Sequence, residues 1–217
     1  MVPPPPLEFP ALLARLAKHG ERPALTFYQG KTPGGRLSYA ELVARVEAVA
    51  GGLSEGLGVR PGDRVALLTP NRLEVPVLVL ALLRLGAVVV PLNPGSSLAD
   101  WKFILAHSGA RALCGTPELL ERVEQKARPE AVLPIDAVSS LSGRAPDPPT
   151  GLSEAMAAVL YTSGTTGSPK GVALRQRNLI ANAWSMAQNF GLDGTTQLAV
   201  LPLYHAHAFG FGLMTAL

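Results

Sequence analysis

The stretch "VALLTPNRLEVPVLVLALLRLGAVVVPL", residues 65–92, decides the fold. Two short apolar runs, residues 65–68 and 87–92, flank a longer apolar segment at residues 72–85. Strands that are buried on both faces have such unbroken apolar composition, and the longer segment has the length of a helix. Pro76 fits this helix only in its first turn. The stretch therefore predicts a strand, a helix and a second strand that is parallel to the first.

The same alternation continues on the C-terminal side of this stretch. We expect a helix over residues 97–107, a strand over 110–115, a helix over 118–126 and a strand over 131–136. Strands that alternate with helices form right-handed crossovers and a parallel sheet. The predicted fold class is therefore α/β, with mostly parallel sheets flanked by helices.

On the N-terminal side, the pattern predicts a mixture of helix and strand. The predicted elements are a helix over residues 9–19, a strand over 24–28, a turn at "KTPGGR" (31–36) and a helix that follows Ser38. Ser38 and Glu41 have the spacing of a capping box, in which each side chain bonds the other residue's backbone N–H. His19 and His107 are expected near helix ends, where the helix dipole is a sufficient explanation for them.

Residues 138–154, "VSSLSGRAPDPPTGLSE", have the Ser, Gly and Pro content of a linker. We therefore predict an N-terminal α/β subdomain at 1–137 and the start of a second α/β subdomain at 155–217. Within the second part, the pattern predicts strands at 155–161, 171–174 and 197–201, a helix at 176–190 and a helical piece from Ala208.

The composition excludes several classes of protein. Among 217 residues, 47% are hydrophobic and 16% charged, which suits a well-buried α/β core. The net charge is +3 and no block of like charge occurs, so there is no sign of a nucleic-acid partner. Proline, glycine and arginine interrupt the most apolar window, residues 75–92, so we expect no transmembrane segment. Cys114 is the only cysteine, which agrees with a cytoplasmic location.

The loop "YTSGTTGSPKG", residues 161–171, has the composition of an oxyanion site. Glycines let backbone N–H groups approach a ligand, hydroxyl groups add donors, and Lys170 adds a compact positive charge. Its spacing, Gly164-x-x-Gly167-x-x-Lys170, differs from the G-x-x-x-x-G-K-[ST] loop of the P-loop NTPases. The loop therefore suits a polyphosphate but argues against an NTPase of that class.

Residues 161–172 closely resemble the phosphate loop of the adenylate-forming enzymes, which is close to [YF]-T-S-G-[ST]-T-G-x-P-K-G-V. This superfamily includes acyl-CoA synthetases, aryl-CoA ligases, adenylation domains of peptide synthetases and luciferases. Weaker family motifs are similar to "LSYAEL" (37–42), "LLRLGAVVVPLNPG" (82–95) and "LPLYHAHAFG" (201–210), in the family's order. The resemblance thus covers nearly the whole chain.

This resemblance implies an enzyme that joins a carboxylic acid to ATP, with Mg²⁺, and passes the acyl group from the adenylate to CoA. It implies that His205 lies beside the carboxylate as a catalytic residue and that Thr166 binds the metal. The residues implied to bind the β- and γ-phosphates are Thr162, Ser163, Gly164, Thr165, Thr166, Gly167 and Lys170. Neither the acid nor the acceptor, CoA or a carrier protein, follows from this sequence.

The chain lacks the other motifs of the superfamily: the aromatic-Gly-x-Thr-Glu segment, the ribose-binding Asp and the lysine of the C-terminal lid. We therefore expect the N-terminal part of such an enzyme, inactive alone, that exposes an apolar surface. That surface would contact the missing C-terminal part or form a homo-oligomer. The alternative is a non-catalytic module that binds ATP, pyrophosphate or a partner and pairs with a separate C-terminal half.

Overall fold

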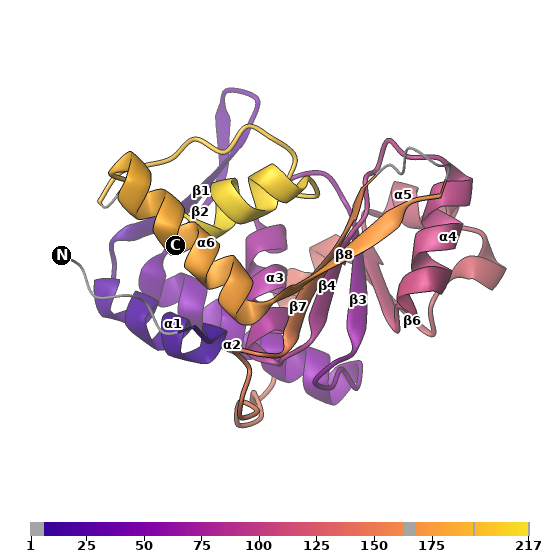
Figure 1. Ribbon diagram of the computed structural model, residues 1–217, viewed down its shortest axis with the longest axis horizontal. Coiled ribbons are helices and arrows are strands. Elements are labelled where there is room, and N and C mark those ends of the chain that lie inside the picture. Colours follow the sequence, from indigo (N-terminus) through magenta and orange to yellow (C-terminus); the bar gives the residue numbers. More distant parts are fainter. Residues whose placement is uncertain (1–6, 163–167, 193, 217) are drawn as a thin grey trace.

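The central element of the fold is a six-stranded β-sheet in the order β6-β5-β3-β4-β7-β8 (Figure 1). The computed structural model describes residues 7–162, 168–192 and 194–216. Five strands are parallel, and β8 is antiparallel to β7. The predicted α/β class with a mostly parallel sheet is confirmed. The strands are β3 (Arg64–Leu68), β4 (Val88–Pro91), β5 (Ala112–Gly115), β6 (Ala131–Pro134), β7 (Met156–Thr162) and β8 (Lys170–Arg175).

Helices cover both faces of the sheet (Figure 1). One apolar core lies between the sheet and α1, α2, α3, α6 and η4, and a second lies between the sheet and α4 and α5. In the part of the chain that the structure describes, no helix is long and apolar enough for a membrane span. The helices are α1 (Phe9–Leu16), α2 (Tyr39–Gly56), α3 (Glu74–Arg84), α4 (Leu98–Ser108), α5 (Pro117–Arg122) and α6 (Gln176–Phe190), with the short η1 (Ala17–His19), η2 (Gln125–Ala127), η3 (Ile135–Ser140) and η4 (Ala208–Met214).

Helix α3, within residues 65–92, is buried from Val75 to Arg84. The Nε of Arg84 donates to Oε1 of Glu47 at 2.9 Å, and Nη2 donates to the carbonyl of Pro146 at 3.1 Å. A buried guanidinium requires such partners, because its desolvation is otherwise costly. Gly86 has a φ of 72°, which lets the chain leave α3 and enter β4 at once.

Capping boxes fix the starts of two helices. At α2, the Ser38 N–H donates to Oε2 of Glu41 at 2.8 Å, and the Glu41 N–H donates to Oγ of Ser38 at 3.2 Å, as predicted. Ser97 and Asp100 form the same arrangement at α4. Each box satisfies backbone donors that a helix leaves unpaired, which stabilises the helix by about 1 kcal/mol.

The turn predicted over residues 31–36 is wrong, because residues 32–38 form strand β2. Strand β1 (Pro23–Gln29) pairs antiparallel with β2 (Thr32–Ser38), and the chain reverses at Gly30 and Lys31. Gly30 supplies the positive φ, 64°, that favours glycine in a tight hairpin. At Gly34 in β2, a Cβ would lie 3.0 Å from Cδ1 of Phe27, so the absence of a side chain makes room for that ring.

The strand predicted over residues 197–201 is also wrong. Residues 195–200 have no regular secondary structure, and the side chains of Leu198 and Val200 are 82% and 73% exposed. A strand needs a neighbour to bond its N–H and C=O groups, and no strand among the described residues pairs with this segment. Its apolar pattern alone therefore does not determine its conformation.

The predicted linker, residues 138–154, packs on the domain along its length. Val138 and Leu152 are buried, and Gly143 lies against Gly51 of α2. Beyond it, Ala158 of β7 pairs with Val89 of β4, so segments from both sides of the linker share one sheet. The division into 1–137 and 155–217 stays a prediction.

Candidate functional site

A hollow of about 980 Å³ lies at the edge of the sheet where the parallel strands end. In open α/β sheets, ligands bind outside the carboxyl ends of the strands. The hollow is lined by residues that directly follow β3, β4, β5 and β6, by the β1–β2 hairpin and by the segment before η4. These include Phe27, Tyr28, Asn71, Arg72, Glu74, Pro94, Thr116, Glu118, Asp136, Val200 and Tyr204.

The described ends of the predicted phosphate loop, Thr162 and Lys170, lie opposite each other. Thr162 is the last residue of β7, Lys170 is the first residue of β8, and the two are paired in the ladder. The residues Ser163, Gly164, Thr165, Thr166 and Gly167, predicted to bind phosphate, lie outside the described residues. Because β7 is parallel to β4, Thr162 lies at the carboxyl edge of the sheet.

Both loop ends are open to solvent. The side chains of Thr162 and Lys170 are exposed, and Lys170 forms no ion pair with any residue that the structure describes. A hydroxyl donor and an unneutralised ammonium at the end of two paired strands can hold an anion. Neither residue lines the hollow.

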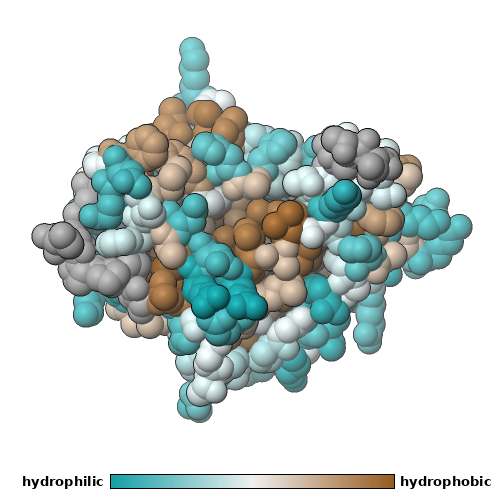
Figure 2. Space-filling model, viewed as in Figure 1, coloured by the Kyte–Doolittle hydropathy of each residue, from teal (hydrophilic) through white to brown (hydrophobic). Residues whose placement is uncertain are grey.

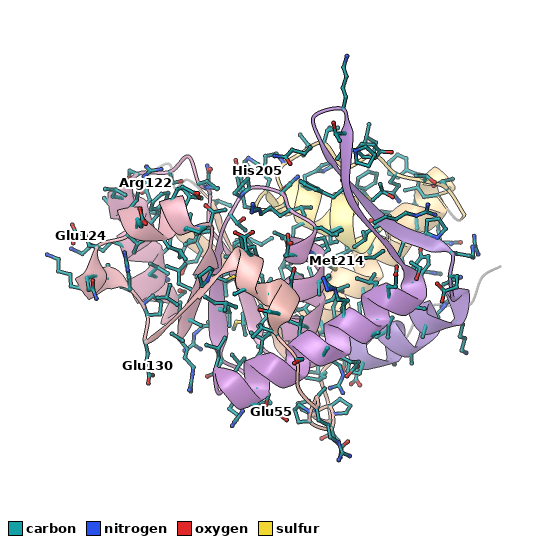
Figure 3. The ribbon with its side chains drawn as sticks, turned by 180° about the vertical axis from the view of Figure 1, so that it is seen from behind. Glu55, Arg122, Glu124, Glu130, His205 and Met214 are labelled. Carbon is teal, nitrogen blue, oxygen red and sulfur yellow. The ribbon has the colours of Figure 1, made fainter. Side chains whose placement is uncertain are left out.

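His205 directly follows Tyr204, which lines the hollow, but is not itself a lining residue. Its ring is exposed and tilted against that of Tyr204, with ring centroids 4.7 Å apart. Figure 3 shows His205 on the upper side of the molecule, to which the β1–β2 hairpin also projects. The structure thus places His205 next in sequence to a residue that lines the hollow, and its role in the site stays a prediction.

Asn71, which sequence reasoning did not select, holds the segment before His205. Its Nδ2 donates to the carbonyl of Leu201 at 3.0 Å, and its Oδ1 accepts from the N–H of Leu203 at 2.8 Å. Asn71 follows β3, so its amide ties this segment to the carboxyl edge of the sheet. The only signal in the sequence was a polar side chain just after a buried strand.

Tyr161, next to Thr162, contacts helix α4. Its hydroxyl lies 2.7 Å from Nδ1 of His107, and the two rings meet edge to face with centroids 5.8 Å apart. Burial raises the pKa of Tyr161 above its ordinary value, so the phenol stays protonated at neutral pH. The phenol O–H donates to Nδ1 when that nitrogen carries no proton, and Nδ1 donates to the phenol oxygen in the other neutral tautomer of His107.

Metal ligands are sparse. Within the described ranges, no three His, Cys, Asp or Glu side chains gather in a possible metal site. Thr166, predicted to bind Mg²⁺, lies outside those ranges. Mg²⁺ is often held mainly by substrate phosphates and water, with few protein ligands.

Comparison with known proteins gives one family. The model of the AMP-binding enzyme family matches residues 12–217. The chain is 38% identical over 204 residues to a feruloyl-CoA synthase from an Amycolatopsis species, with 93% of this chain and 40% of the relative covered. It is 36% identical over 207 residues to 4-coumarate–CoA ligase-like 5 from Oryza sativa subsp. japonica, with 88% and 38% covered. The chain thus spans about 40% of the length of these curated relatives.

Solved structures agree. ATP-bound MatB from Rhodopseudomonas palustris has a TM-score of 0.78 at 27% identity, covering 94% of this chain and 42% of that one. The o-succinylbenzoate CoA synthetase of Bacillus subtilis, in complex with its acyl-adenylate intermediate, has a TM-score of 0.75 at 30% identity. That match covers 94% of this chain and 52% of the synthetase.

Proposed function

Because the chain belongs to the AMP-binding enzyme family, we propose that it is the N-terminal part of an acyl-CoA synthetase-like ligase. The whole ligase would activate a carboxylic acid with ATP to an acyl-adenylate and then form a CoA thioester. One observation carries the proposal: Thr162 and Lys170 are paired across β7 and β8, at the two ends of a loop rich in Gly, Ser and Thr. This pairing places a hydroxyl group and a cation at the carboxyl edge of the sheet.

In this proposal, residues of this chain bind the pyrophosphate part of ATP, which is the leaving group. Lys170 and Thr162 bind the β- and γ-phosphates together with Ser163, Gly164, Thr165, Thr166 and Gly167. When bound, ATP would supply the adenylyl group, and Thr166 would hold Mg²⁺, which would neutralise phosphate charge. Donors that are already oriented stabilise the charge that develops on pyrophosphate as the carboxylate oxygen displaces it from the α-phosphorus.

His205 would orient the acid. Its exposed ring lies two residues after Leu203, which Asn71 holds, so the backbone that carries the imidazole is tied down close to Tyr204, a lining residue of the hollow. We propose that the imidazole binds the carboxylate on its way to the α-phosphate. Such positioning lowers the barrier by removing the entropy cost of bringing the reactants together.

The rest of the ligase would cover surfaces that this chain exposes. Strand β8 pairs only with β7 among the described strands, and Val172 on it is 49% exposed. Figure 2 shows apolar surface between α6 and β8 on the same face. An unpaired strand edge beside apolar surface is typical of an interface. The C-terminal part of the enzyme is the partner we propose, and a second copy of the chain is the alternative.

Acid-dependent exchange of pyrophosphate into ATP by the complete protein tests the proposal. Lys170→Ala should lower exchange at least about a hundredfold, because a cation that contacts phosphate is lost from the site. Lys18→Ala, which removes an exposed lysine of η1, is the matched control and should exchange like wild type. The names of the relatives put hydroxycinnamic acids first in the substrate panel, followed by aliphatic acids.

Full exchange in Lys170→Ala would overturn the role of the loop. No exchange with any acid, together with pyrophosphate binding by the 217-residue chain and co-purification of a separate C-terminal chain, would favour the non-catalytic module. A protein that exchanges pyrophosphate and one that does not are distinct results, so the exchange assay on the complete protein decides between the ligase and the non-catalytic module.

A further inference from the structure

We propose that His107 is a positioning residue for the phosphate loop and acts through Tyr161. This inference rests on the proposed function of the loop. It assigns a role in nucleotide binding to a side chain of α4, a helix that contributes no other residue to the site.

The contact joins the last turn of helix α4 to the end of strand β7. Nδ1 of His107 is 2.7 Å from the hydroxyl of Tyr161, and the imidazole stacks on Phe103 with centroids 5.2 Å apart and planes 19° apart. Phe103 lies one helical turn before His107 on the same face of α4. The stack limits the rotation of the imidazole, so its nitrogen stays directed at the phenol.

The other side of the Tyr161 ring rests on Gly171. The two residues are register partners in β7 and β8, and a Cβ at position 171 would lie 3.1 Å from Cζ of Tyr161 and 2.9 Å from Cγ1 of Val159. A side chain at position 171 would therefore have to displace Val159 or the Tyr161 ring. Tyr161 is thus held by α4 through its hydroxyl and by β8 through its ring.

This arrangement fixes both ends of the loop together. Thr162 follows Tyr161, and Lys170 precedes Gly171, so the clamped pair is one residue from each phosphate-binding end. Successive side chains of a strand point to opposite faces, so a fixed Tyr161 also fixes the direction of Thr162. A site whose ends are already placed loses less entropy when a ligand binds.

The exposure of the contact separates positioning from stability. His107 is exposed and Tyr161 half-buried, so water can replace the bond without leaving a buried group unpaired. The loss of the bond should then have little effect on unfolding. It should instead increase the freedom of the strand ends from which the loop starts.

The test compares four single variants, the double variant Tyr161→Phe/His107→Ala and Lys170→Ala, all in the complete protein as its gene encodes it. Tyr161→Phe and His107→Ala each remove the bond, and His107→Asn keeps a polar atom near the position of Nδ1. Tyr39→Phe is the matched control, because Tyr39 meets His19 ring to ring at 4.9 Å far from the loop. The measurements are the KM for ATP and for the acid, the Kd for Mg²⁺-ATP by calorimetry, and the melting temperature.

We expect Tyr161→Phe and His107→Ala each to raise the KM and Kd for ATP about three- to tenfold, the effect of one hydrogen bond. The KM for the acid should stay unchanged, and the melting temperature should fall by less than about 3 °C. The double variant should bind ATP no more weakly than either single variant, because both remove the same bond. His107→Asn should recover part of the affinity, and Tyr39→Phe should match wild type.

The outcomes distinguish this inference from the proposed function. If Lys170→Ala weakens ATP binding but Tyr161→Phe and His107→Ala do not, the positioning role is wrong and the function of the loop stands. If Lys170→Ala also binds ATP like wild type, the proposed function fails first. Equal rises in both KM values, or additive effects in the double variant, would overturn the role of His107 as well.

Discussion

The amide of Leu203 donates to Oδ1 of Asn71 at 2.8 Å, across 132 residues of sequence. Asn71→Ala removes this bond and the bond from Nδ2 to the carbonyl of Leu201. We expect the free energy of unfolding to fall by about 1–3 kcal/mol, because two neutral hydrogen bonds are lost at a partly buried site. Hydrogen exchange at Leu203 should accelerate more than exchange in β3. Asn182→Ala, at an exposed position of α6, is the control.

Gln176 is a second long-range connection, and it is completely buried. Its Nε2 donates to the carbonyl of Leu83 at 2.7 Å, and its Oε1 accepts from the N–H of Phe9 at 3.0 Å. Gln176→Ala leaves the N–H of Phe9 without its partner and removes one of the donors to the carbonyl of Leu83, which also accepts from the N–H of Gly86 at 3.1 Å. We therefore expect a loss of about 1–3 kcal/mol in urea unfolding. Gln188→Ala, on the exposed face of the same helix, should change stability by less than about 0.5 kcal/mol. Similar effects of the two substitutions would contradict this role.

Two glycines of α2 should respond in opposite ways to the same substitution. A Cβ on Gly51 would lie 2.2 Å from the carbonyl carbon of Gly143, whereas a Cβ on Gly56 would have nothing within 4 Å. Gly51→Ala should therefore destabilise the protein by about 2 kcal/mol or more, because backbone must move. Gly56→Ala should be neutral or stabilise it by up to about 1 kcal/mol, because alanine favours helix. Thermal unfolding of the two variants measures both signs, and a stable Gly51→Ala would show that residues 138–154 do not pack here.

The buried thiol of Cys114 should make stability depend on alkaline pH. Burial, and secondly the charge of Asp136, raises the pKa of Cys114 far above its ordinary value. Above a pH of about 8.5 the unfolded thiol ionises while the folded thiol stays neutral, so the unfolded state binds fewer protons and stability falls as pH rises. The slope should approach about 1.4 kcal/mol per pH unit. Urea unfolding under reducing conditions at pH 7, 9 and 10 measures it, and Cys114→Ala should remove this part of the slope.

The parallel core could be predicted from sequence because burial on both faces leaves an unmistakable pattern. "VALL" and "AVVVPL" are apolar throughout, and both became central strands. The secondary-structure predictions were wrong where the pairing of strands determines the conformation. Pro33, Gly34 and Gly35 look like a turn, but they lie in β2 because the reversal comes earlier, at Gly30. Residues 197–201 look like a strand, but an apolar pattern cannot supply the neighbour that a strand needs.

The candidate site, like the fold, could be predicted from the sequence only in part. Thr162 and Lys170 were predicted from a contiguous motif, and their pairing agrees with the strands predicted on either side of the loop. Asn71 and His107 were not predicted as parts of the site, since each acts on a segment far away in the sequence. A single asparagine after a strand, or a histidine at the end of a helix, has many local explanations. Only the tertiary contacts show which backbone or side chain each one meets.

The position of β7 beside β4 has a consequence for the order in which the protein assembles. The chain completes β3 to β6 before it reaches β7, so a ribosome releases the four-stranded parallel unit before the hairpin that carries Thr162 and Lys170. Contacts that are close in sequence form faster than those that close a long loop, so we expect the hairpin to dock late on an existing edge. Substitutions in a hairpin that docks after the nucleus has formed should then change the rate of unfolding more than the rate of folding.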